Sequence, residues 1–93
     1  MRDIYFFILA QMIGIIKKLV ADKGFGFIAP QDGGGDLFFH CTKVLGGGQI
    51  FNDWAEIDPT TGKAAKEGAT VNYTPVQGKK GTEAHDVELA DAE

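Results

Sequence analysis

Glycine and phenylalanine alternate in the run Lys23-Gly24-Phe25-Gly26-Phe27-Ile28, and this alternation is the strongest constraint on the fold. Side chains on a β-strand point alternately to opposite faces, so the run predicts a strand with Lys23, Phe25 and Phe27 on one face. Gly24 and Gly26 occupy the other face. Because glycine has no side chain, that face lets another backbone approach closely or lets the strand bend sharply.

A second aromatic run, Asp36-Leu37-Phe38-Phe39-His40, follows after a turn rich in glycine. On this predicted strand Phe38 and His40 share a face, while Phe39 points the opposite way. Antiparallel pairing of the two runs would gather four rings on one side of a sheet. We call this set the aromatic face; its members are Phe25, Phe27, Phe38 and His40.

The aromatic face has two interpretations. Aromatic residues on strands usually belong to a hydrophobic core. Rings that alternate with glycine, however, cannot fill a core from both sides of the strand. The alternation therefore favours an exposed surface that stacks unpaired bases, because every base has a π-face and every nucleotide brings a phosphate for a nearby lysine.

The order of the motifs distinguishes between folds. The run beginning at Lys23 fits the start of an RNA-binding pattern that lies on a late strand in RNA-recognition motifs. Here it comes early, and the Phe-Phe-His run follows almost at once, which resembles the cold-shock domain, a small OB-type β-barrel that binds single-stranded RNA and DNA. The resemblance extends from about Gly14 to Val87 and rests on ordered matches in the segments 14–17, 21–28, 36–40, 67–73 and 78–87.

The resemblance implies an all-β fold, a small five-stranded OB-type Greek-key barrel, with bases stacked on the aromatic face. It also implies phosphate contacts from Lys17, Lys18 and Lys23. Two ring positions of the family are missing, since Lys18 replaces a usual tryptophan and Cys41 a usual aromatic residue. Each base–aromatic stack is worth roughly 1–3 kcal/mol, so we expect altered binding, partly offset by a phosphate contact from Lys18.

We expect a barrel at residues 12–89, preceded by an apolar extension at 1–11 and followed by an acidic tail at 90–93. The apolar run from Ile4 to Ile16 is too short and interrupted to span a bilayer as a helix, and it is a poor signal peptide. The extension is either an added upstream segment or a cover for an exposed patch, in a dimer for example. We expect a monomer with no membrane association.

An insertion at about 46–65 lengthens the connection after the Phe-Phe-His run relative to the family. Within it, Asp58-Pro59-Thr60-Thr61-Gly62-Lys63 predicts a hairpin loop, because proline presets φ and glycine supplies a left-handed residue. Phe51 and Trp54 precede this loop. Trp54 either anchors the insertion to the barrel or joins the aromatic face in place of the missing tryptophan.

The net charge of −4 argues against a strongly basic duplex-DNA binder. Residues 12–87 hold eight lysines and nine acidic residues, so the barrel itself is nearly neutral and binding would depend mainly on stacking. The single cysteine excludes an intrachain disulfide and favours a reducing, cytoplasmic location.

No catalytic or cofactor motif is recognisable. His40 and Cys41 are adjacent on a predicted strand, so we expect them to face opposite ways and form no reactive pair. One cysteine and two histidines give no zinc ligand set. The predicted function is binding of single-stranded RNA or DNA with low sequence specificity, as an RNA chaperone or expression regulator and not as an enzyme. The alternative is a protein-interaction module with weak or lost nucleic-acid binding.

Overall fold

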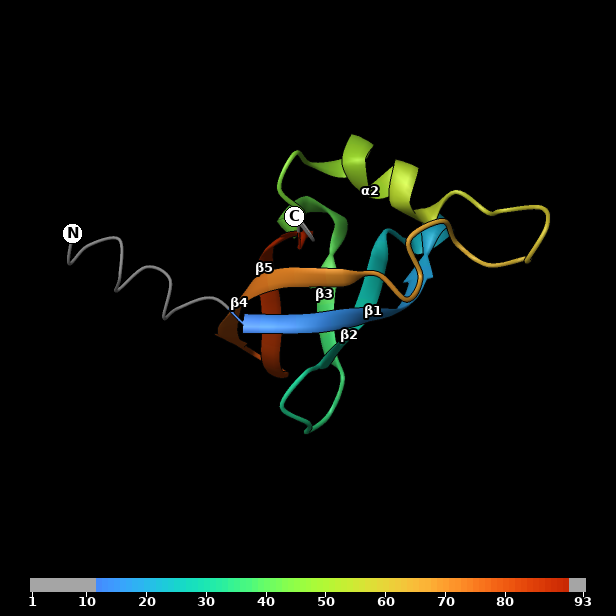
Figure 1. Ribbon diagram of the computed structural model, residues 1–93. Coiled ribbons are helices and arrows are strands. Elements are labelled where there is room, and N and C mark those ends of the chain that lie inside the picture. Colours follow the sequence, from blue (N-terminus) through green and yellow to red (C-terminus); the bar gives the residue numbers. More distant parts are fainter. Residues whose placement is uncertain (1–11, 91–93) are drawn as a thin grey trace, which may run out of the picture.

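The computed structural model describes residues 12–90, and the segment 1–11, for which an apolar extension is predicted, lies outside the described residues. Five strands close into a barrel in the order β1-β2-β3-β5-β4 (Figure 1). Neighbouring strands are antiparallel except β3 and β5, which run parallel. The predicted all-β, OB-type barrel is confirmed. The strands are β1 (Met12–Val20), β2 (Phe25–Pro30), β3 (Leu37–His40), β4 (Thr70–Gly78) and β5 (Gly81–Leu89).

Each strand contributes at least one fully buried side chain to the centre of the barrel. These side chains are 0 or 1% exposed and come from alternate positions, as expected for strands with one face inside and one outside. On β1, for example, Ile16 is buried while Ile13 and Ile15 are exposed. The central residues are Ile16, Ile28, Phe39, Val71 and Val87.

The glycine face of β2 accommodates a ring from β3. Gly26 pairs in register with Phe39, and a Cβ atom at Gly26 would lie 2.8 Å from Cε1 and Cζ of that ring. The same atom would lie 2.7 Å from the backbone oxygen of Lys18. The bare face expected for the alternating run is therefore occupied by the Phe39 side chain, which is 0% exposed.

A helix that the sequence analysis did not predict lies between β3 and β4. The 3-10 turn η2 (Cys41–Lys43) leads through a glycine-rich bend into α2 (Gly48–Ala55), which covers one end of the barrel (Figure 1). Phe51 and Trp54 occur at a spacing of three residues and so share the face that turns inward. They are 1% and 4% exposed, and the Phe51 ring meets Phe39 edge-on at 6.2 Å.

The hairpin loop predicted after this region is present. Ile57 and Ala64 form an isolated antiparallel bridge, and the Asp58 N–H donates to the Lys63 carbonyl at 2.8 Å. Gly62 has φ +76°, the left-handed conformation expected of it, and Asp58 Oδ1 accepts from the Thr60 N–H at 2.8 Å. The loop projects away from the barrel (Figure 1).

No helix within residues 12–90 is long and apolar enough to cross a membrane.

Candidate functional site

The four members of the aromatic face lie together on the outside of β2 and β3. Phe25 is opposite His40, and Phe27 is opposite Phe38. The three phenylalanine ring centroids lie 5.4 to 6.1 Å apart with tilted or edge-on geometry. All three rings are partly exposed and His40 is exposed. The predicted gathering of these side chains is confirmed, and their role in binding stays a prediction.

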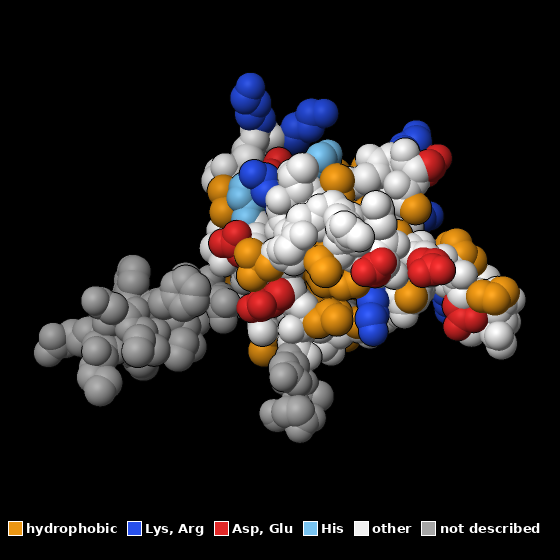
Figure 2. All heavy atoms as spheres, turned by 90° about the horizontal axis from the view of Figure 1, so that it is seen from above, with side chains coloured by type: hydrophobic (Ala, Val, Ile, Leu, Met, Phe, Trp, Pro, Cys, Tyr) orange, Lys and Arg blue, Asp and Glu red, His pale blue; other side chains and the backbone are white. Residues whose placement is uncertain are grey.

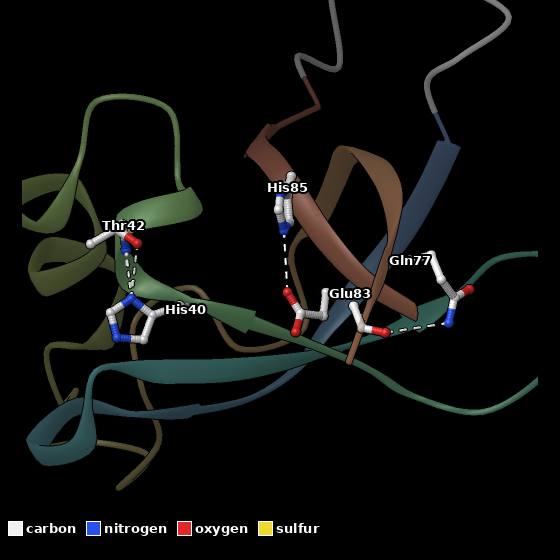
Figure 3. Close-up of polar contacts among 6 residues, drawn as sticks. His40, Thr42, Gln77, Glu83 and His85 are labelled. Atoms are coloured by element: carbon white, nitrogen blue, oxygen red, sulfur yellow. Dashed lines mark hydrogen bonds and ion pairs between the residues drawn. The ribbon is translucent and has the colours of Figure 1, made fainter. Parts of the chain in front are cut away.

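The imidazole of His40 is held by the second residue of the next turn, η2. The backbone N–H of Thr42 donates to His40 Nδ1 at 3.2 Å, and the Thr42 hydroxyl lies 2.9 Å from the same nitrogen (Figure 3). Because a backbone N–H only donates, Nδ1 acts as an acceptor and the neutral ring carries its proton on Nε2. The contacts with Thr42 thus orient the ring and leave the Nε2–H group of His40 available as a hydrogen-bond donor.

The expectation that His40 and Cys41 face opposite ways is wrong. Cys41 Sγ lies 3.8 Å from His40 Nδ1, because β3 ends at His40 and Cys41 already belongs to η2. The alternation of a strand does not extend into a 3-10 turn. The Cys41 sulfur shares His40 Nδ1 with the closer contacts from Thr42, and its own contact with that nitrogen is long.

The three predicted lysines occupy different environments. Lys18 is exposed and pairs in register with Phe27, which places it beside the aromatic face. Lys17 falls in an irregularity of the β1–β2 ladder, and its Nζ lies 3.5 Å from Asp36 Oδ2. Lys23 is exposed in η1 (Ala21–Lys23), before β2 begins at Phe25, so the alternation argument does not place it on that face.

The sequence leaves two roles open for Trp54, and its burial agrees with anchoring the insertion to the barrel and not with membership of the aromatic face. Its side chain is only 4% exposed and belongs to the core cluster with Phe39 and Phe51. The backbone oxygen of Trp54 also accepts from Lys66 N–H at 3.0 Å, which ties the end of α2 to the chain entering β4. A ring this buried offers no free face to a base.

The structure adds residues that the sequence analysis did not assign to the site. A hollow of about 530 Å³ opens beside the aromatic face, where the β4–β5 turn meets β3. The sequence does indicate a basic turn here, because two adjacent lysines stand between two glycines. No local sequence pattern, however, predicts that this turn lies next to Phe38. The lining residues are Phe38, Lys79, Lys80, Gly81, Thr82 and Glu83.

The charges around this site are mixed. Within residues 12–90 the ion pair between a lysine and a carboxylate is that of Lys17 with Asp36, so Lys18, Lys79 and Lys80 are not neutralised by another described side chain. Figure 2 shows lysine side chains projecting from one edge of the molecule, with acidic and hydrophobic groups intermixed across the middle of the view. No three His, Cys, Asp or Glu side chains among the described residues form a metal-binding group.

Comparison with known proteins agrees with this architecture. A family model described as "'Cold-shock' DNA-binding domain" matches residues 12–90. The chain is 38% identical over 77 residues to "Cold shock-like protein CspB" of Yersinia pestis, covering 83% of this chain and 91% of that protein. It is 38% identical over 71 residues to "Cold shock protein CapA" of Pseudomonas fragi, covering 76% of this chain and 91% of that one. The chain belongs to the cold-shock DNA-binding domain family.

Proposed function

We propose that this protein binds single-stranded RNA or DNA with low overall sequence specificity by stacking bases on the aromatic face. The observation that carries the proposal is the packing of three phenylalanine rings, with centroids 5.4 to 6.1 Å apart, on the outside of a closed barrel. The rings pack against one another on paired strands, so less side-chain freedom is lost when bases stack.

The lysines beside the rings complete the interface. Lys18 lies opposite Phe27, and Lys79 and Lys80 line the hollow next to Phe38. A strand that stacks on the rings would bring its phosphates to these amino groups, which form no ion pair within the described residues. Stacking supplies most of the affinity because the number of lysines is small.

The proposed mechanism is passive. Binding of unpaired nucleotides shifts the folding equilibrium of an RNA toward its open form, without nucleotide hydrolysis. The protein would then act as an RNA chaperone or as a regulator of expression. The names of the two relatives, "Cold shock-like protein CspB" and "Cold shock protein CapA", each covered over 91% of its length, support this proposal. A cytoplasmic location and a monomeric state belong to the same proposal.

Titration of a labelled oligouridine heptamer, followed by fluorescence anisotropy, tests the proposal. Phe27→Leu and Phe38→Leu keep an apolar side chain but remove a ring, and each should weaken binding roughly five- to 150-fold, the equivalent of about 1–3 kcal/mol per stack. Ile15→Ala is the matched control, because Ile15 is an apolar residue 47% exposed on β1 that belongs to no ring cluster. Equal affinity in all three variants and the original protein would refute the stacking mechanism.

A protein-interaction role is the second candidate, and one observation favours it. Large apolar side chains are exposed outside the aromatic face, including Ile13 at 42% and Ile15 at 47% on the same strand. Absence of oligonucleotide binding by the folded protein would favour this role over the proposed one.

A further inference from the structure

The hollow beside Phe38 contains a carboxylate as well as a ring and two lysines. Phe38 and Glu83 are register partners at the point where β3 and β5 run parallel. Side chains of neighbouring partners lie side by side on a sheet, and both line the hollow. A base stacked on Phe38 with its edge toward β5 would therefore meet the carboxylate of Glu83.

The Glu83 carboxylate is positioned by one hydrogen bond, and it occupies space that a glycine leaves open. His85 Nε2 donates to Glu83 Oε1 at 3.2 Å (Figure 3). The other oxygen lies over Gly78, where a Cβ atom would come within 2.5 Å of Oε2. The Glu83 side chain remains 34% exposed. Each carboxylate oxygen has two lone pairs, so the contact with His85 leaves acceptor capacity on both oxygens.

Among the four common bases, only guanine offers a carboxylate two adjacent donors on its Watson–Crick edge. These are N1–H and the exocyclic N2 amino group. Uracil has a single N3–H between two carbonyl oxygens, and adenine and cytosine each set one amino group beside a ring nitrogen that repels a carboxylate. An ionised carboxylate accepts hydrogen bonds but does not donate them. It therefore distinguishes between bases by the number of adjacent donors that each base presents.

We propose that Glu83 reads guanine at the nucleotide position that stacks on Phe38, so that one position of an otherwise tolerant site is base-selective. This inference rests on the proposed stacking function. Lys79 and Lys80, which line the same hollow, would bind the phosphates of this nucleotide and offset repulsion between them and Glu83. An oligonucleotide without guanine would leave the carboxylate unpaired next to the strand.

The test uses the full chain and three heptamers. One is oligouridine, one carries a single central guanosine, and one carries inosine at that place. Inosine keeps the purine ring and N1–H but lacks the N2 amino group, so the ratio of guanosine to inosine affinity separates paired hydrogen bonding from purine stacking. We expect a ratio of roughly tenfold, the value of one charge-assisted hydrogen bond.

Glu83→Gln removes one of the two carboxylate acceptors and should lower the ratio to about twofold or less. It should leave oligouridine affinity unchanged or raise it, because a negative charge near the strand is lost. Glu88→Gln is the matched control: it makes the same change on the same strand, at a residue that pairs with Asn72 and does not line the hollow. This control should keep the ratio of the original protein.

The outcomes separate the two proposals. Oligouridine binding with a ratio near one, or a high ratio that survives Glu83→Gln, would overturn the role of Glu83 and leave the stacking function intact. Failure of all three heptamers to bind the folded protein would overturn both.

Discussion

Gly26 and Phe39 form a complementary pair across β2 and β3, in which the missing side chain of one makes room for the ring of the other. They are register partners, and the ring carbons Cε1 and Cζ lie 2.8 Å from where a Cβ atom of residue 26 would stand. The pair explains why glycine alternates with phenylalanine in this strand. The rings of β2 point outward, while the inner space at Gly26 belongs to a ring from β3.

Gly26→Ala should destabilise the barrel by about 1–3 kcal/mol, the usual cost of overpacking a filled core. The added methyl group meets the Lys18 backbone oxygen as well as the ring, so neither neighbour gives way easily. Urea unfolding followed by circular dichroism measures the change. Gly35→Ala is the control, because nothing lies within 4 Å of its Cβ position, and equal stability of the two variants would contradict the packing argument.

Trp54→Ala should lower the free energy of unfolding by about 3–5 kcal/mol, as for other buried large aromatic residues. Trp54→Phe keeps a ring in the core and should cost much less. Trp54 is the only tryptophan, so its emission reports on this position alone. Saturating oligonucleotide should leave that emission nearly unchanged, and strong quenching would show that a base reaches the indole despite its 4% exposure.

Salt dependence measures how many lysines contact phosphates. If Lys18, Lys79 and Lys80 make the phosphate contacts, the logarithm of the binding constant should fall with log salt with a slope of about −2, at about −0.7 per contact on a single strand. Replacing both Lys79 and Lys80 with glutamine leaves one phosphate contact, so the slope should change to about −0.7. Lys63→Gln, on the loop that projects from the barrel, should not change it. A slope unaffected by the double variant would place the phosphates elsewhere.

Stability should decline at alkaline pH through Tyr73. Burial of this side chain, with a smaller effect of the Asp32 charge, raises the pKa of its phenol above the ordinary value of 10.0. The unfolded chain then loses the phenolic proton at lower pH than the folded chain does. Below pH 10 the contribution of Tyr73 to stability is fully present, and it falls as pH rises through the folded-state pKa.

Ultraviolet difference titration, compared between the original protein and Tyr73→Phe, gives the ionisation curve of this residue. The same variant should show a shallower loss of stability as the pH rises above 10.0, the ordinary pKa of the phenol. Identical pH dependence in the two proteins would mean that Tyr73 ionises equally easily in both states.

The sequence predicted the aromatic face well because that face depends on strand alternation and on one short turn. Phe25, Phe27 and Phe38 are placed by local geometry, and local geometry is what a pattern of residues encodes. The same argument was wrong for Cys41 and does not apply to Lys23, because each of these residues lies in a 3-10 turn outside the strands. Strand boundaries are the least certain part of such an inference.

The parts that could not be predicted depend on contacts between distant segments. Trp54 is buried because α2 folds onto the end of the barrel, and only the three-residue spacing of Phe51 and Trp54 indicated a helical face. Glu83 reaches the site because β5 lies beside β3, a neighbour relation that follows from barrel closure. Neither the burial of Trp54 nor the hollow is visible in a single stretch of sequence.

The parallel pairing of β3 with β5 has a consequence for folding. Phe38 and Glu83 are 45 residues apart in the chain, so the hollow exists only once the last strand has docked. A ligand that contacts both sides stabilises the closed chain over any form in which β5 is detached. Occupancy would therefore slow the detachment of β5 and protect its amides from hydrogen exchange.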